Sequence, residues 1–142
     1  MTTPLVVDSS AWVAIALQES DAWWFEETLA DTDGPVMSAG TLQEVISVLG
    51  KRSRADNVNA LDFAAFVTKT ALGQGIRIVP VDATLATLGA AGSLRFQSRP
   101  ASLNFGDGFA YSLAISLGAP ILCKGEDFVH TNVAVLRPPT ND

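Results

Sequence analysis

Short apolar runs alternate with helical patterns along the whole chain, and this alternation constrains the fold more than any other feature of the sequence. The predicted strands cover residues 5–7, 35–37, 76–81, 121–123 and 133–136. The predicted helices cover residues 11–17, 21–29, about 41–52, 60–72, 82–89 and 107–117, and a surface loop is predicted over 90–103. Strands that alternate with helices favour a mainly parallel sheet with helices on both faces. We therefore expect an α/β fold, a three-layer α/β/α sandwich with four or five strands.

The size and composition of the chain fit one compact domain. It has 142 residues, of which 48% are hydrophobic and 17% are charged, a balance typical of globular proteins. That length is enough for one sizeable core, and no linker-like stretch divides the sequence. We expect residues 1–142 to form a single domain.

The sequence also predicts a cellular location. No apolar run is long enough to cross a bilayer, and the start MTTPLVVDSS lacks the basic residues and long apolar segment of a signal peptide. Cys123 is the single cysteine, which excludes an intramolecular disulfide. These features favour a reducing cytoplasm and no membrane contact.

The scarcity of cysteine and histidine limits the chemistry. A zinc site of the usual kind needs several Cys or His ligands, and this chain has one of each. Cys123 and His130 could form a thiol nucleophile with its base, but Cys123 falls in an apolar strand, which favours an inert core residue. Carboxylates remain as the main reactive groups.

Three aspartates fall where an α/β crevice is expected. Asp8 follows the first predicted strand, Asp107 opens a helix, and Asp127 lies just beyond the strand at 121–123. In an open α/β sheet, strand ends and helix starts face the same crevice. The three carboxylates can therefore meet although they are distant in sequence.

Each of these acids also has a structural interpretation. Asp8, or a serine beside it, can cap the following helix. Asn104 and Asp107 resemble a capping box, in which the two side chains bond to each other's backbone amides. Glu44 points away from the apolar stripe of its helix, so the pattern by itself predicts a solvated glutamate.

A fourth acid, Glu44, makes a metal site possible. Gathering like charges is costly unless a positive charge lies among them. A divalent cation supplies that charge, and an all-oxygen ligand set favours Mg²⁺ or Mn²⁺. Such a site would activate water and neutralise charge on a phosphodiester, which suggests hydrolysis of a nucleic-acid backbone.

The net charge of −6 argues at first against nucleic acid as a partner. If four carboxylates belong to a metal site, the remaining charge is −6 + 4 = −2. Basic residues also cluster, at Lys51, Arg52 and Arg54 and again at Arg95 and Arg99. We expect Arg95 and Arg99 to border the crevice and bind RNA phosphates, although solvated loop charges are the commoner meaning of such clusters.

The chain resembles a known family at these residues. The matching segments are VVDSSA at 6–11, SAGTLQEVISVL at 38–49, LNFGDGFAYSLA at 103–114 and KGEDFVHTN at 124–132. They resemble, in order and spacing, the VapC-type toxins of bacterial and archaeal toxin–antitoxin systems, which are PIN-domain ribonucleases. The resemblance covers nearly the whole chain.

The resemblance implies a function and its residues. Asp8, Glu44, Asp107 and Asp127 match the family's metal-binding acids, and Mg²⁺ or Mn²⁺ would support endonucleolytic cleavage of an RNA substrate. It further implies a PIN-like fold, a homodimer and neutralisation by a cognate VapB-type antitoxin whose C-terminal segment occupies the active-site groove. We expect Ser9 and Thr131 to assist beside the acids.

Three positions depart from the family pattern. Asn132 stands where many relatives carry aspartate, which would leave a neutral oxygen donor and a lower metal affinity. Glu126 stands where aspartate is common, although Asp127 is kept. Gly108 follows Asp107 where relatives often have a small or thiol residue, which would loosen the start of the helix.

Two other functions fit parts of the sequence. A PIN-fold module could bind RNA or protein without cleaving it. A phosphatase with an aspartate nucleophile would also place an acid after an apolar strand, at Asp8. That chemistry usually needs another aspartate two residues later, where this chain has Ser10.

Overall fold

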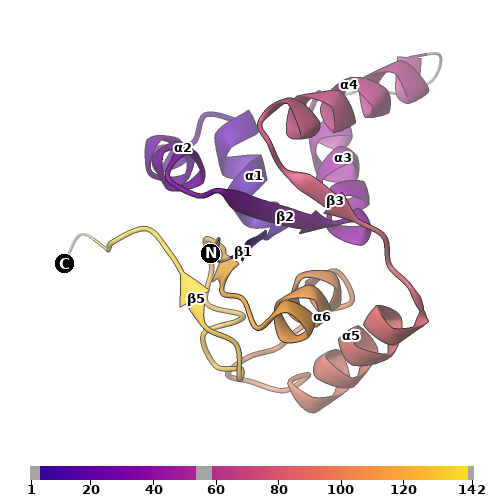
Figure 1. The fold of residues 1–142 in the computed structure, drawn as a ribbon, viewed down its shortest axis with the longest axis vertical. Coiled ribbons are helices and arrows are strands. Elements are labelled where there is room, and N and C mark those ends of the chain that lie inside the picture. Colours follow the sequence, from indigo (N-terminus) through magenta and orange to yellow (C-terminus); the bar gives the residue numbers. More distant parts are fainter. Residues whose placement is uncertain (1–3, 54–58, 141–142) are drawn as a thin grey trace.

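The structure, a computed structural model, describes residues 4–53 and 59–140 and contains a five-stranded parallel sheet. The strands are β1 (Pro4–Val7), β2 (Gly34–Ser38), β3 (Arg77–Val79), β4 (Ile121–Leu122) and β5 (Val135–Leu136), in the spatial order β3-β2-β1-β4-β5 (Figure 1). All four neighbouring pairs are parallel. The predicted α/β class and parallel sheet are confirmed.

Six helices within the described residues cover the sheet. They are α1 (Ser9–Ala16), α2 (Ala22–Ala30), α3 (Ala39–Ser53), α4 (Ala60–Gly73), α5 (Ala83–Arg95) and α6 (Asp107–Leu117). Helices α1 to α4 lie on one side of the sheet, and α5 and α6 lie on the other (Figure 1). No helix in the described ranges is long and apolar enough to cross a membrane.

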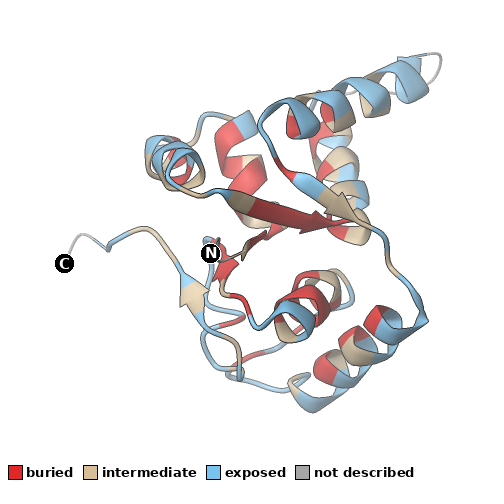
Figure 2. Ribbon diagram, in the orientation of Figure 1, coloured by how far each residue is buried: buried red, intermediate tan, exposed pale blue. Residues whose placement is uncertain are grey.

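Alternate strand residues supply two separate cores, one on each face of the sheet. Val6 pairs in register with Val36 and Ile121, and these three residues pack beneath α5 and α6. Val7 and Leu122 face the opposite side, with α1 to α4. Figure 2 shows buried residues along the central strands and on the helix faces turned towards them. Burial on both faces explains why these strands read as continuous apolar runs rather than as alternating patterns.

The carboxyl ends of the central strands lie together because the strands are parallel. Asp8 follows β1 directly, and its backbone N–H donates a hydrogen bond to the Leu122 carbonyl oxygen at a distance of 3.0 Å. The loop that carries Asp127 begins where β4 ends. The fold therefore brings the segments after β1 and β4 side by side, at the carboxyl ends of the strands.

Helix α5 is longer than predicted. The sequence pattern ends it near Gly89, but it continues to Arg95, so the surface loop predicted over 90–103 begins only after Arg95. Gly89 is buried, and a Cβ there would lie 2.8 Å from the backbone oxygen of Gly108 in α6. The glycine allows two helix backbones to approach closely and does not end the helix.

The same contact corrects the expectation for Gly108. A Cβ at this buried position would lie 3.0 Å from both the Gly89 carbonyl oxygen and Ser93 Oγ. The start of α6 is therefore packed tightly against α5, where the sequence suggested a loosened helix end. The prediction was wrong because conformational freedom was weighed without the neighbouring helix.

Candidate active site

Four carboxylates from four parts of the chain line one pocket. The pocket has a volume of about 220 Å³ and lies beside the ends of β1 and β4. Its lining comprises Asp8, Ser9, Ser10, Glu44, Asn104, Asp107, Cys123, Gly125, Asp127 and Phe128. All four acids singled out in the sequence are thus brought to the same place.

Asp8 both caps a helix and faces the pocket. Its carboxylate accepts hydrogen bonds from the Ser10 backbone N–H at 3.1 Å and the Ser10 hydroxyl at 2.6 Å. The side chain is only 5% exposed. Burial raises the pKa of Asp8, and nearby Glu44 adds to the rise, while the bonds from Ser10 oppose it. The two interpretations of this residue are therefore compatible.

Asp107 is held by a reciprocal pair of hydrogen bonds with Asn104. The Asn104 N–H donates to Asp107 Oδ2 at 3.0 Å, and the Asp107 N–H donates to Asn104 Oδ1 at 2.9 Å. The bonds predicted for a capping box are present, although α6 begins at Asp107 itself. These two bonds stabilise the turn over residues 104–107, which positions the Asp107 carboxylate.

The pKa of Asp107 is raised by burial and by the acids around it. Burial raises its pKa to about 6, against the hydrogen bond from the Asn104 amide. The negative charges of Asp8, Asp127 and Glu44 also contribute to this rise. These three carboxylates are close enough to repel Asp107, so the four acids form one electrostatic group.

Glu44 turns from α3 into the pocket. The buried face of α3 carries Thr41, Val45 and Leu49, and Glu44 is half-buried beside it. Its carboxylate lies directly against Gly106, where an added Cβ would overlap Oε2. The solvated glutamate that the helix pattern predicted is therefore wrong, because a loop from elsewhere in the chain covers this face.

The loop after β4 is fastened to the first helices. The Lys124 backbone N–H donates to the Ser10 hydroxyl at 3.0 Å. The Lys124 ammonium contacts Glu19 at 2.8 Å and Asp21 at 3.1 Å, and the hydrogen bond to Glu19 is the main reason that the pKa of Lys124 is raised. Exposed Asp127 lines the pocket from this loop.

Ser10 and Gly106 are two residues that the sequence reasoning did not place in the site. Ser10 links the Asp8 carboxylate to the backbone of the β4 loop, and Gly106 leaves room for Glu44. In the sequence, the one indication that Gly106 belongs to the site is its position next to Asp107 in the segment LNFGDGFAYSLA. No local pattern predicts that a glycine faces a glutamate on another helix.

The donor set fits a hard divalent cation. Within the described residues, the pocket lining carries four carboxylates and no lysine, arginine or histidine. Within those same residues, no three His, Cys, Asp or Glu side chains converge as a preformed metal-binding group. The four carboxylates nevertheless share one pocket and raise the pKa of Asp107 by repulsion, which a divalent cation among them would relieve. Oxygen donors of this kind suit Mg²⁺ or Mn²⁺.

Of the supporting residues expected from the sequence, only Ser9 lines the pocket. Thr131 donates to the Phe128 carbonyl at 2.7 Å, which closes a turn. The Asn132 side-chain oxygen accepts from the Tyr111 hydroxyl at 2.8 Å. Thr131 and Asn132 therefore stabilise the segment behind the pocket.

The predicted RNA-binding arginines lie outside the acidic pocket. Arg95 and Arg99 are both exposed, and the Arg95 guanidinium carbon lies 4.8 Å from the centroid of the Phe96 ring. Lys51 and Arg52 lie in the last turn of α3, and Arg54 falls outside the described residues. Neither Arg95 nor Arg99 therefore lines the acidic pocket.

Cys123 lines the pocket as a buried free thiol. Burial raises its pKa to about 12, with a further contribution from the charge of Asp8. A thiol with so high a pKa stays protonated at neutral pH and is a poor nucleophile. This favours the interpretation of Cys123 as an inert core residue.

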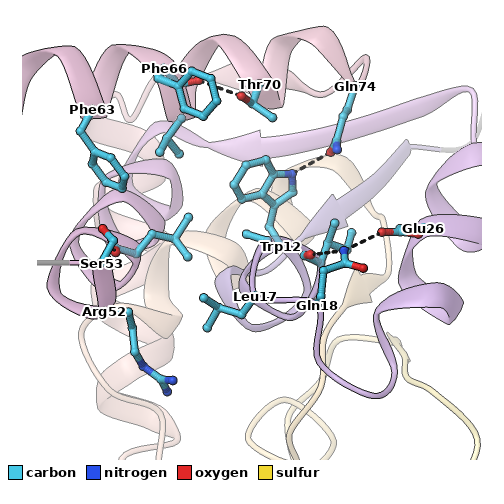
Figure 3. A pocket seen from close by; sticks show the side chains of 14 residues that line it. Trp12, Leu17, Gln18, Glu26, Arg52, Ser53, Phe63, Phe66, Thr70 and Gln74 are labelled. Atoms are coloured by element: carbon cyan, nitrogen blue, oxygen red, sulfur yellow. Dashed lines mark hydrogen bonds between the residues drawn. The ribbon is translucent and has the colours of Figure 1, made fainter. Parts of the chain in front are cut away.

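A larger cavity, of about 510 Å³, lies between α1, α3 and α4 (Figure 3). Its lining is mainly apolar, and the Trp12 indole N–H donates there to the Gln74 side-chain oxygen at 3.0 Å. None of the four pocket acids lines it. Although it is larger than the acidic pocket, this cavity therefore takes no part in chemistry by the carboxylates.

Comparison with known proteins gives matches over almost the whole chain. The family model described as PIN domain matches residues 5–134. Ribonuclease VapC42 of Mycobacterium tuberculosis is 33% identical over 132 residues, which cover 91% of this chain and 96% of that protein. Ribonuclease VapC28 of the same species is 36% identical over 133 residues, covering 91% and 95%.

Solved structures match the fold. The sarcin-ricin loop cleaving toxin VapC20 of M. tuberculosis has a TM-score of 0.74 at 19% identity, covering 94% of this chain and 99% of that one. A chain of VapBC2 from Rickettsia felis, bound to a DNA fragment from its promoter, has a TM-score of 0.69 at 14% identity and covers 96% and 99%.

Proposed function

The chain belongs to the PIN-domain family, among the VapC ribonucleases, and from this we propose that it is a divalent-metal-dependent endoribonuclease, the toxin of a type II toxin–antitoxin system. One observation carries the proposal: Asp8, Glu44, Asp107 and Asp127 line a single pocket. Carboxylates gathered in this way suit a metal-assisted hydrolysis better than a phosphatase with one nucleophilic aspartate.

The residues divide into two roles. Asp8, Asp107 and Asp127 hold Mg²⁺ or Mn²⁺, directly or through water, and Glu44 completes the site or orients the attacking water. When bound, the cation supplies charge neutralisation at the phosphate and a more acidic water. Hydrolysis would form a bond between the water oxygen and phosphorus and break the bond from phosphorus to the leaving ribose oxygen. The proton that the water loses would be matched by one that the leaving oxygen takes up from solvent.

The hydrogen bonds around the acids keep them in place for this work. Ser10 holds the Asp8 carboxylate from one side, and the Asn104 amide holds the Asp107 carboxylate from the other. Because Ser10 and Asn104 are close in sequence to the acids that they bind, these bonds fix each carboxylate relative to its own turn of backbone. Such prior orientation reduces the cost of binding the metal and the substrate phosphate.

The proposal includes partners and a location. The substrate is RNA, and the cognate partner is a VapB-type antitoxin, as VapBC complexes such as that of R. felis suggest. We further propose a homodimer and a cytoplasmic location. Residues 1–142 act as one domain in this proposal, since both cores share one sheet.

A cleavage assay tests the function. The purified protein is incubated with total cellular RNA in Mg²⁺, in Mn²⁺ and in EDTA, and the new RNA ends are sequenced. We expect cleavage only with a divalent cation and a loss of about 100-fold or more in Asp8→Asn and Asp107→Asn. Asp62→Asn is the matched control, because Asp62 is an exposed acid of α4 that does not line the pocket.

The result also separates the enzyme from a non-cleaving module. Metal-dependent cleavage that is undiminished in Asp8→Asn and Asp107→Asn would refute the residue roles. RNA retention without cleavage in either cation would favour the binding module instead.

A further inference from the structure

Phe105 is a large aromatic side chain left in solvent beside the acidic pocket. It is 84% exposed, and its ring meets Phe109 edge to face, with centroids 5.2 Å apart and planes at 81°. Phe109 thus supports one edge of the ring and leaves much of its surface uncovered. With Leu94, which is also exposed and lines the same hollow, the ring forms an apolar surface, and such surfaces mark contacts with a ligand or a partner.

A hollow of about 570 Å³ adjoins this ring. It lies between α5 and α6, with Phe105, Phe109 and Leu94 as its apolar walls. Asn104 lines both this hollow and the acidic pocket, so the two lie next to each other. A ligand that reaches the carboxylates can therefore extend into the hollow.

The lining of the hollow also includes residues whose side chains can form hydrogen bonds. The side chains of Ser93, Gln97 and Asn104 line it beside the aromatic rings. Arg95 and Arg99, both exposed, come from the end of α5 and the segment after it, which also carry the lining residues Leu94 and Gln97. A flat aromatic wall, amide groups and nearby cations match a nucleobase attached to a phosphate chain.

We propose that Phe105 stacks on a base of the RNA substrate next to the phosphate cleaved at the acidic pocket, which makes the hollow a nucleobase subsite. This inference rests on the proposed ribonuclease function. Phe105 and Asp107 are two positions apart, so their Cα atoms are at most about 7.6 Å apart. One nucleotide can thus place its phosphate at the acids and its base at the ring.

A second copy of the chain is the other occupant that an apolar hollow of this kind could take. The shared Asn104 wall favours RNA, because it sets the hollow beside the carboxylates that would act on the phosphate, and the exposed Arg95 and Arg99 carry charge that attracts a phosphate chain. The experiment therefore measures self-association alongside RNA binding.

The test uses a short single-stranded RNA that spans a mapped cleavage site and versions in which single bases are replaced by abasic riboses. Equilibrium binding is measured by fluorescence anisotropy in Ca²⁺, and kcat/KM is measured in Mg²⁺. The wild type should lose on the order of 5- to 150-fold in affinity when the stacked base is removed. Phe105→Ala should lose a similar factor on intact RNA and should no longer distinguish the abasic RNA.

Matched variants identify the cause. Phe105→Trp should restore the affinity, and Phe66→Ala should behave as wild type, because Phe66 is a 68% exposed phenylalanine on α4 that lines neither the hollow nor the acidic pocket. Mn²⁺ binding by Phe105→Ala should equal that of the wild type, since the acids are unchanged.

Several outcomes would overturn the subsite. One is normal RNA affinity in Phe105→Ala, and another is continued sensitivity of this variant to the abasic position. A third is sedimentation showing that Phe105→Ala dissociates an oligomer whose loss accounts for the weaker RNA binding. A wild type that binds RNA in Ca²⁺ but cleaves none would remove the proposed enzyme, while the abasic comparison would still decide the role of Phe105.

Discussion

The α-carbon of Gly106 faces the carboxylate of Glu44 so closely that a Cβ at residue 106 would overlap Glu44 Oε2. The backbone of residue 106 has ordinary right-handed helical angles, φ −63° and ψ −37°, so an alanine is conformationally acceptable there. Space for Glu44, rather than backbone freedom, is therefore the reason for a glycine at this position.

Gly106→Ala should thus damage activity more than stability. The added methyl would push the end of the flexible Glu44 side chain out of its place, so we expect a loss of about 10-fold or more in kcat with a change of less than about 1 kcal/mol in the free energy of unfolding. Gly125→Ala is the matched control, because Gly125 also lines the pocket and an added Cβ meets nothing within 4 Å. Equal activity in both variants would show that Glu44 is free to move.

The raised pKa of Asp107 predicts a pH-dependent stability of the metal-free protein. With a folded pKa of about 6 against 3.8 in the unfolded chain, the folded state binds more protons between these values. Stability from this group is therefore lost as the pH rises from 3.8 through 6. Asp107→Asn removes that loss, so its free energy of unfolding relative to wild type should rise by about 1 kcal/mol between pH 5 and pH 7.5.

Urea unfolding in EDTA at the two pH values measures this difference. Asp62→Asn serves as the control, because Asp62 is an exposed acid of α4 that does not line the pocket. A constant difference between Asp107→Asn and wild type at pH 5 and pH 7.5 would show that burial and the neighbouring carboxylates do not raise the pKa of Asp107.

The close approach of α5 and α6 should make Gly89 intolerant of a side chain. A Cβ at Gly89 would meet the Gly108 carbonyl oxygen at 2.8 Å, and neither backbone can yield easily. We expect Gly89→Ala to destabilise the protein by about 1–3 kcal/mol. Gly73→Ala, at the end of α4 with nothing within 4 Å of its new methyl, should be neutral or stabilising by up to about 1 kcal/mol. The same urea midpoint for both variants would contradict this contact.

Ser10 should matter through the residues that it connects. Ser10→Ala removes the 2.6 Å bond to Asp8 and leaves the Lys124 N–H without its side-chain acceptor. We expect the free energy of unfolding to fall by about 1–2 kcal/mol. We also expect a lower metal affinity, seen as a higher Mg²⁺ concentration for half-maximal cleavage. Ser116→Ala on the exposed side of α6 is the control. An unchanged Mg²⁺ requirement would limit Ser10 to helix capping.

Local patterns predicted most of the fold because they depend on neighbours in sequence. The apolar runs around Val6 and Ile121 become buried strands, and Asp8 caps a helix as its position after a strand suggested. The reciprocal bonds of Asn104 and Asp107 were also predictable, since the two residues lie in one turn. These features need no knowledge of the rest of the chain.

The remaining features depend on contacts between distant segments. Gly89 was taken for a helix end because its partner, Gly108, belongs to another helix. Glu44 was assigned to solvent by its helix pattern because the turn at Gly106 that covers it comes much later in the sequence. Asn132 pairs with Tyr111, which a comparison of single positions with a family pattern cannot reveal.

Manganese binding at pH 7.5, followed by electron paramagnetic resonance, tests most directly whether the four acids act as one site. Single amide variants of Asp8, Glu44, Asp107 and Asp127 are compared with wild type and with Asp62→Asn. We predict that each pocket variant weakens Mn²⁺ binding by about 10-fold or more and that Asp62→Asn does not. Wild-type affinity in Asp8→Asn and Asp107→Asn would contradict a shared metal site at these carboxylates.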